Sequence, residues 1–306
     1  MSGETIAVFT KNRTNPAYDA ARLGADRTAA RNDARTVHFV PSQPDDIDEQ
    51  IALVERAIAA RPSAVVFVPV HLTALDASVR QLNAAGIPVV NYLNRLERGR
   101  FVTFVGSDDY RLGRDIAGYL FRHLGGKGDV MIMEGVPGAV TSRDRVRGFH
   151  DAARDCPGVR IVATRAGDYQ EATARSVMTE ILAQRVHLDG VLSANDVMSL
   201  GVLSALDAAG LSIPVIGVNA LPEAIASLKA GKLLATVDFD AMKIGCIATE
   251  AAIRHLRGQA VPAEIMLPVQ IVDRSNYQPW DRPLVERECP RWNDVVGNCR
   301  TGPSIS

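Results

Sequence analysis

Neither sign of charge is in excess in this sequence, and long apolar runs are missing. Its 306 residues include 34 Lys and Arg against 35 Asp and Glu, which gives a formal net charge of −1. A protein that binds nucleic acid normally carries a basic face or tail, so the balance argues against nucleic acid as a partner. No apolar run approaches the roughly 20 residues of a membrane-spanning helix. The length predicts two domains, each large enough to bury its own core.

Catalytic motifs are also missing. The sequence contains no GxSxG nucleophile elbow, no P-loop, no GxGxxG and no HExxH. Its six histidines are scattered, and no two of them have the spacing of metal ligands on one helix face. The sequence therefore predicts a protein that is not an enzyme and that has no cofactor and no bound metal.

The amino terminus shows no export-leader pattern. The first four residues lead directly into an expected strand, Thr5–Phe9, without the basic and apolar segments of a signal peptide. Two interpretations remain, a cytoplasmic protein or an exported domain whose leader has been removed. Cys289 and Cys299 lie in a tail that contains Pro, Trp and Asn, as a small disulfide loop would, whereas Cys156 and Cys246 lie in helix-rich stretches and are expected to be isolated thiols. A disulfide in the tail favours an oxidising compartment, and we expect the periplasm.

Against these absences stands an internal repeat. The stretches from Ser63 to Asn94 and from Asp189 to Ala220 have the same plan: an apolar strand, a short polar turn, an amphipathic helix ending at Ala-Ala-Gly, and a second apolar strand after a proline. In both copies the closing strand runs into an asparagine. Because open α/β sheets bind ligands at the carboxyl ends of their strands, the repeat predicts two similar lobes that each offer a strand edge to a shared cleft.

Apolar, Val- and Ile-rich runs alternate with amphipathic helices along the chain. This alternation predicts an α/β fold in which parallel sheets are covered by helices on both faces. A helix over Lys243–Leu256 and a strand over Ile265–Val272 follow after the second series is complete. If that helix rejoins the first lobe, the chain crosses between the lobes three times and forms a hinge. The expected crossings lie at about Ser107–Asp109, Asp238–Asp240 and Val269–Asp273.

These crossings set the expected domain bounds. The amino-terminal lobe is expected to comprise residues 1–107 and 240–270, and the carboxyl-terminal lobe residues 108–239 and 271–306. The tail beyond Asp273 has prolines close to both tryptophans and is expected to lie as a strap on one lobe, which we take to be the second.

Five segments in the correct order resemble a known family. They are IAVFTKNRTNPAYDAARLGA, GSDDYRLGRDIAGYL, TSRDRVRGF, SANDVMSLGVLSAL and PVIGVNALPEAI. Together they resemble the ribose-binding type of periplasmic solute-binding protein from sugar ABC importers, over roughly Thr5 to Asp273. The resemblance implies two flavodoxin-like lobes of the type I periplasmic binding protein fold, which close on one small ligand at a hinge.

The resemblance also implies a function. It predicts an extracytoplasmic protein that captures a small carbohydrate-like ligand (a sugar, a polyol or a sugar acid) in the interlobe cleft and delivers it to an ABC permease in the membrane, most simply as a monomer. Two alternatives remain open. The protein could present the bound solute to a membrane receptor as a sensing module, or it could be an enzyme on a Rossmann-like scaffold.

In the first lobe, the resemblance implies ligand contacts in two loops. They are Asn15, Tyr18, Asn94 and Arg95, and Lys11, at the end of the first strand, is a further polar candidate. Asn15 could instead be a turn residue held before proline. The family has an aromatic ring at each of the two positions after that proline, and here the first is Ala17. One inserted residue makes the register near Asn94 uncertain, so Asn91 is an alternative.

In the second lobe the resemblance implies six contacts. They are Arg145, Tyr169, Asn195, Asn219, Asp238 and Phe239. Arg145 is preferred to Arg143 because a guanidinium can span two sugar oxygens, although either could form a surface salt bridge. Tyr169 is placed to stack on the apolar face of a sugar ring. We assign helix capping to Asp196 and ligand binding to Asn195.

Two expected contacts depart from the family in charge. Asn94 and Asn219 are amides where the family has carboxylates, while Arg95 and Arg145 remain. A neutral sugar or polyol still fits, because amides both donate and accept hydrogen bonds. A sugar acid is a competitor, because the arginines are then less neutralised.

Overall fold

The computed structural model describes residues 3–296 and divides into two compact units. The first unit comprises residues 3–107, 240–268 and 284–296, and the second comprises residues 108–239 and 269–283. The chain therefore passes between the units after residues 107, 239, 268 and 283. The last of these passages was not expected. The tail does not lie wholly on the second lobe as predicted, because residues 284–296 pack with the first unit.

The first unit is built on a six-stranded sheet. Its strands are β1 (Thr5–Phe9), β2 (Arg35–Phe39), β3 (Ala64–Phe67), β4 (Val89–Tyr92), β5 (Thr103–Gly106) and β11 (Glu264–Met266). Its helices are α1 (Pro16–Arg31), α2 (Ile47–Ala60), α3 (Asp76–Ala84) and α9 (Ala241–Leu256), and the tail adds a 3-10 turn, η1 (Leu284–Glu286), and α10 (Trp292–Val296).

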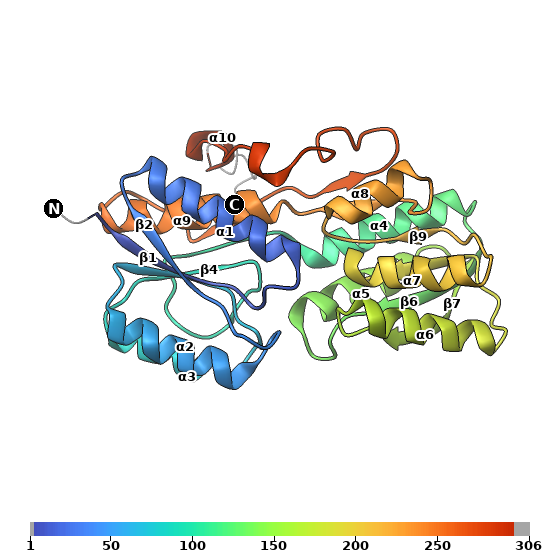
Figure 1. The fold of residues 1–306 in the computed structure, drawn as a ribbon, viewed down its shortest axis with the longest axis horizontal. Coiled ribbons are helices and arrows are strands. Elements are labelled where there is room, and N and C mark those ends of the chain that lie inside the picture. Colours follow the sequence, from blue (N-terminus) through green and yellow to red (C-terminus); the bar gives the residue numbers. More distant parts are fainter. Residues whose placement is uncertain (1–2, 297–306) are drawn as a thin grey trace, which may run out of the picture. The chain divides into compact units, whose positions relative to one another are not determined.

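All pairings in this sheet are parallel, in the order β11-β5-β4-β3-β1-β2. Helices α1 and α9 pack together on one face, and α2 and α3 lie on the other (Figure 1). Every residue of β3, β4 and β5 is buried, as expected of apolar strands that are covered on both faces. The rings of Phe9, Phe39 and Phe67, from β1, β2 and β3, form part of the core that includes α2 and α3.

The second unit repeats this plan with a smaller sheet. Its strands are β6 (Gly128–Glu134), β7 (Val159–Ala166), β8 (Gly190–Ser193), β9 (Val215–Ile216), β10 (Thr236–Asp238) and β12 (Gln270–Val272). Its helices are α4 (Asp109–His123), α5 (Val140–Arg154), α6 (Glu171–Ala183), α7 (Asp196–Ala208) and α8 (Pro222–Lys229). Strands β7-β6-β8-β9 form a parallel sheet, and an isolated bridge pairs Ile216 of β9 with Ala235, the residue before β10. Helix α4 packs beside α5, and α6 packs beside α7.

The internal repeat corresponds to one strand-helix-strand unit in each half. The first copy folds as β3, α3 and β4, and the second as β8, α7 and β9.

Capping side chains in the sequence fix where helices begin. Asp46 accepts a hydrogen bond of 2.8 Å from the backbone N–H of Glu49 at the start of α2, and Asp108 accepts one of 2.9 Å from Arg111 at the start of α4.

One expected strand is in fact two. The predicted strand over Ile265–Val272 is divided into β11, which pairs with β5 in the first unit, and β12, which pairs antiparallel with β10 in the second. Pro268 lies between them, at the point where the chain passes from one unit to the other. Proline has no N–H to donate to a ladder, so it ends the first strand there.

The expected disulfide is also corrected. Cys289 is bonded to Cys246 of α9, and not to Cys299, which lies outside the described residues. Cys246 is therefore not the isolated thiol that its helical context predicted, whereas Cys156 is free and partly buried. The bond joins residues 43 apart and fastens the tail to the first unit.

Within the described range, no helix is long and apolar enough to cross a membrane.

Candidate functional site

In the first unit, three predicted contacts follow the carboxyl end of β1. Lys11 is buried, and its Nζ lies 3.3 Å from Oδ1 of Asp45. Asn15 caps α1, because its side-chain oxygen accepts a hydrogen bond of 3.0 Å from the backbone N–H of Ala17. Tyr18 is half-buried in the first turn of the same helix. The cap engages the amide oxygen of Asn15 and does not engage its NH₂ group.

The register at the end of β4 is decided by the hydrogen bonds of Asn91. Its NH₂ group donates to the carbonyls of Phe67 and Asn94 at 3.1 and 2.9 Å, and its oxygen accepts from the N–H of Leu96 at 2.9 Å. These bonds hold the turn after β4 together, so Asn91 has a structural role. Asn94 is 6 % exposed, and its side chain has no hydrogen-bond partner in the described part of the chain.

Arg95 is directed elsewhere. Its guanidinium forms an ion pair with Glu264 of β11 and lies over the ring of Phe104 of β5, 4.1 Å from the ring centre. The side chain is 47 % exposed. Its charge is therefore compensated by Glu264 at the edge of the sheet.

In the second unit, Arg145 lies at the centre of a buried polar cluster. Its Nε donates to Oδ1 of Asp109 at 2.7 Å, and one terminal nitrogen donates to the backbone carbonyl of Ala194 at 2.8 Å. Its guanidinium also faces the ring of Phe239, 5.6 Å from the ring centre. Burial raises the pKa of the Asp109 carboxyl, and the guanidinium of Arg145 opposes that rise. Arg145 is thus fixed by an ion pair that the sequence did not predict.

The helix cap that was expected at Asp196 lies at Asn195 instead. Asn195, not Asp196, caps α7, since its side-chain oxygen accepts a hydrogen bond of 2.9 Å from the N–H of Met198. Asp196 instead accepts bonds from the N–H of Leu221 at 2.9 Å and from the hydroxyl of Thr236 at 2.7 Å. Burial raises the pKa of Asp196 to about 7. As at Asn15, the cap engages the side-chain oxygen of Asn195 and does not engage its NH₂ group.

Asn219 carries an unpaired acceptor. It follows β9 with a backbone φ of 124°, a conformation that residues other than glycine rarely adopt. Its side-chain oxygen is buried and has no hydrogen-bond partner among the described residues. Buried polar atoms are almost always paired, so an unpaired one calls for a donor, such as the hydroxyl of a ligand.

Tyr169 lies against the end of β6. A Cβ placed on Gly135 would come within 2.1 Å of the Tyr169 ring, so only glycine allows the ring to rest on this backbone. The Tyr169 hydroxyl shares a hydrogen bond of 2.9 Å with the hydroxyl of Thr141. Burial raises the pKa of the Tyr169 phenol.

Asp238 ends β10 and is 7 % exposed. Its Oδ2 accepts a hydrogen bond of 2.6 Å from the indole N–H of Trp280, a residue of the tail. Phe239, the next residue, is also buried. Sequence reasoning missed both Asp109 and Trp280. Asp109 lies inside one of the segments that carry the resemblance, so its position offered a signal, whereas Trp280 lies beyond all of them.

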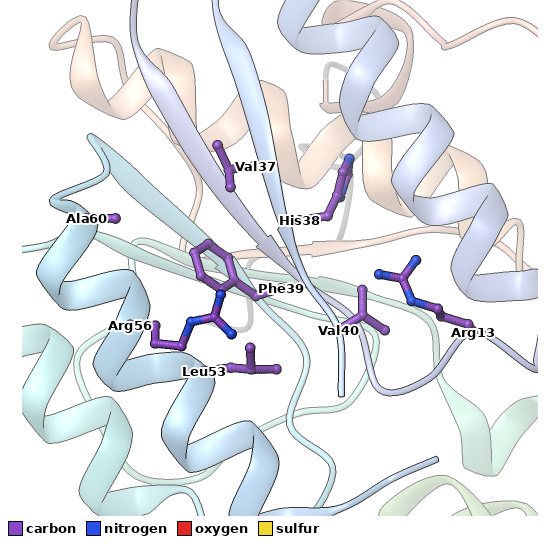
Figure 2. A pocket seen from close by; sticks show the side chains of 8 residues that line it. All are labelled: Arg13, Val37, His38, Phe39, Val40, Leu53, Arg56 and Ala60. Carbon is purple, nitrogen blue, oxygen red and sulfur yellow. The ribbon is translucent and has the colours of Figure 1, made fainter. Parts of the chain in front are cut away.

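A cavity of about 370 Å³ lies elsewhere, beside the edge strand β2 of the first unit (Figure 2). Its lining consists of Arg13, Val37, His38, Phe39, Val40, Leu53, Arg56 and Ala60. None of the predicted contacts lines it.

No group of three or more His, Cys, Asp or Glu that could hold a metal ion occurs in the described ranges.

Comparison with known proteins now assigns the family. Residues 6–260 match the model of the periplasmic binding protein domain. The chain belongs to the periplasmic binding protein family. Among curated relatives, the ribose import binding protein of Bacillus subtilis (strain 168) is 32 % identical over 267 residues, which is 87 % of this chain and 86 % of the relative.

Solved structures of other periplasmic binding proteins have the same fold. An ABC transporter periplasmic solute binding protein from Actinobacillus succinogenes 130z, with bound D-allose, has a TM-score of 0.86, is 29 % identical and covers 90 % of this chain and 99 % of its own. An ABC transporter solute binding protein from Bacillus halodurans C-125, with bound myo-inositol, has a TM-score of 0.85, is 26 % identical and covers 92 % and 98 %. The family resemblance and the α/β fold with helix-flanked parallel sheets are confirmed.

Proposed function

We propose that this protein is the extracytoplasmic solute-binding component of an ABC importer and that it binds a small neutral sugar or polyol. The observation that carries the proposal is the meeting of polar side chains at the carboxyl ends of β8, β9 and β10 in the second unit, with Arg145 of α5 among them. This is the edge at which open parallel sheets bind ligands. The relatives are import binding proteins rather than enzymes, and they favour an importer over a receptor-presenting module.

A neutral ligand is supported by the charges. Arg145 is paired with Asp109, and Arg95 with Glu264, so neither guanidinium requires a carboxylate from the ligand. The amide groups of Asn195 and Asn219 can donate to and accept from hydroxyls. The ring of Tyr169 can cover an apolar face of the sugar. The sugar acid therefore becomes the less favoured ligand.

The proposed cycle is capture and delivery. We propose Lys11, Asn15, Tyr18 and Asn94 as the contacts of the first unit and Arg145, Tyr169, Asn195, Asn219, Asp238 and Phe239 as those of the second. Four passages of the chain between the units would allow hinged closure on the ligand without loss of alignment. We propose that the closed, monomeric protein then delivers the ligand to a membrane permease from the periplasm.

Titration calorimetry with D-ribose, D-allose, myo-inositol and one sugar acid tests the proposal. Mass spectrometry of any compound that copurifies with the protein extends the panel. We expect at least one neutral compound to bind, with little dependence on salt, because an uncharged ligand has no ionic interaction to screen. Tight binding of the sugar acid alone, weakened by salt, would overturn the proposed ligand class. Binding of none of these compounds, with no copurifying carbohydrate, would overturn the proposed function.

A further inference from the structure

The tail after β12 is attached to the second unit at three points. The hydroxyl of Tyr119 donates to Asp273 at 2.7 Å, and Nζ of Lys229 lies 2.7 Å from a carboxylate oxygen of Asp281. Between them, Trp280 donates its indole N–H to Asp238. The first two contacts bring together polar groups that are partly or well exposed, whereas the third reaches a carboxylate that is 7 % exposed.

The same tail is then fastened to the first unit. Cys289 is bonded covalently to Cys246 of α9, and the buried ring of Trp292 lies 4.6 Å from the guanidinium carbon of Arg254. Arg27 of α1 donates to two backbone carbonyls of the tail. A segment held on both sides of its passage between the units is not a loose extension. Its conformation near Trp280 is fixed by contacts that have nothing to do with the ligand.

The contact between Trp280 and Asp238 is suited to holding a carboxylate still. At 2.6 Å it is a short, charge-assisted hydrogen bond, and such bonds are stronger than those between neutral groups. An indole has only two side-chain torsions, so it loses little freedom when it is fixed. Because one oxygen of Asp238 is bound, the plane of its carboxylate is restricted and the direction of its other oxygen is set.

We infer that Trp280 is a positioning residue of the binding site: it orients the Asp238 carboxylate for a ligand hydroxyl, and the neighbouring contacts of the tail within the second unit hold it in place. The inference rests on the proposed function, since it assigns to Asp238 a hydrogen bond to the ligand. It makes the tail a part of the binding apparatus.

The test uses the only two tryptophans of the chain. Trp280→Phe keeps an aromatic ring and removes the N–H donor. Trp292→Phe is the matched control, because Trp292 belongs to the same tail but packs on Arg254 in the first unit. With the neutral compound that binds best in the calorimetry panel, Trp280→Phe should weaken affinity roughly tenfold, and Trp292→Phe should leave it unchanged.

A double-mutant cycle separates positioning from general packing. Asp238→Ala removes the acceptor, and in that background Trp280→Phe should cause less than a twofold further loss, because the group that Trp280 positions is no longer there. An equal loss in both backgrounds would show that Trp280 acts directly on the ligand or through the fold, and would overturn the inference. Unchanged affinity of Trp280→Phe would overturn it as well.

Fluorescence provides a readout that needs no ligand. In the Trp292→Phe protein, Trp280 is the sole tryptophan, and Asp238→Ala, which removes the acceptor of its indole N–H, should shift its emission in the absence of sugar. No shift would refute the contact itself, whatever the protein binds. If no compound of the panel binds but the emission does shift, the contact stands, and both the proposed function and the positioning role that depends on it are overturned.

Discussion

The Arg145→Ala substitution tests the buried ion pair of the second unit. The side chains of Arg145 and Asp109 are 6 % and 13 % exposed, and the atoms that pair are 2.7 Å apart. Removing the guanidinium leaves the Asp109 carboxylate buried without its partner. Breaking a buried pair in this way typically costs about 3–5 kcal/mol. At roughly 2–4 °C per kcal/mol for a domain of this size, the melting temperature of the second unit should fall by about 6–20 °C.

A surface pair in the same unit provides the control. Arg160 binds Asp129 through two contacts of 2.7 Å, but the side chain of Arg160 is 72 % exposed. Solvent screens an exposed pair and leaves it with little effect on stability, so Arg160→Ala should change the melting temperature much less than Arg145→Ala does. Differential scanning calorimetry of both variants, without ligand, measures the contrast.

Two further measurements separate the mechanism from simple loss of packing. A double variant, Arg145→Met with Asp109→Asn, has no buried charge and should recover most of the lost stability. The defect of Arg145→Ala should also be smaller at pH 5 than at pH 8. Burial raises the folded-state pKa of Asp109 above its unfolded value, and without Arg145 nothing opposes that rise. At low pH the carboxyl of the variant is protonated and no unpaired charge is buried. The variant therefore loses stability as pH rises through this folded-state pKa. A single variant as stable as Arg160→Ala, or a double variant less stable than the single one, would refute the reasoning.

Three other outcomes are expected. Peptide mapping without reduction should link Cys246 to Cys289, and finding Cys246 as a free thiol would contradict the assignment. Replacing both cysteines by serine should lower the unfolding free energy by about 4 kcal/mol, because the bond closes a loop of 43 residues. The pKa of Asp196 is about 7 in the folded state against about 3.9 in the unfolded state, so the wild type should lose stability relative to Asp196→Asn as pH rises from 5 to 8. Urea unfolding measures this, and the same dependence of stability on pH in both proteins would count against the shift. Ligand at a hundredfold excess over its dissociation constant should stabilise the fold by about 2.7 kcal/mol and reduce the radius of gyration in small-angle scattering, whereas an unchanged radius at saturation would refute hinged closure.

Local patterns were sufficient to predict the elements and the fold class. The strand Thr5–Phe9 was predicted at the bounds that the structure has, and the helix expected over Lys243–Leu256 begins only two residues earlier, because the burial of an apolar run and the spacing of one helix face depend on neighbouring residues. The repeat predicted the same strand-helix-strand plan in both units. One strand was expected over Ile265–Val272, although Pro268 interrupts that run in the sequence and the structure has two strands there.

The corrections have another physical origin. Asn195 and Asp196 are adjacent and both can cap a helix, so only the fold decides between them: the N–H of Leu221 and the hydroxyl of Thr236 occupy Asp196, and Asn195 is left to cap α7. In the same way, two cysteines pair when the fold brings their side chains together, and their spacing along the chain does not decide it.

The sequence by itself determined two α/β units, the family and the strand edges at which ligand contacts are expected, since each depends on short-range pattern. The tertiary structure alone decided the partners of the side chains. Arg145 meets Asp109 across 36 residues, Asp238 meets Trp280 across 42, and Cys246 meets Cys289 across 43. A side chain's charge state and orientation depend on such distant neighbours, and no periodicity records them. For that reason the sequence located the candidate contacts, while only the fold showed that their arginines are already neutralised.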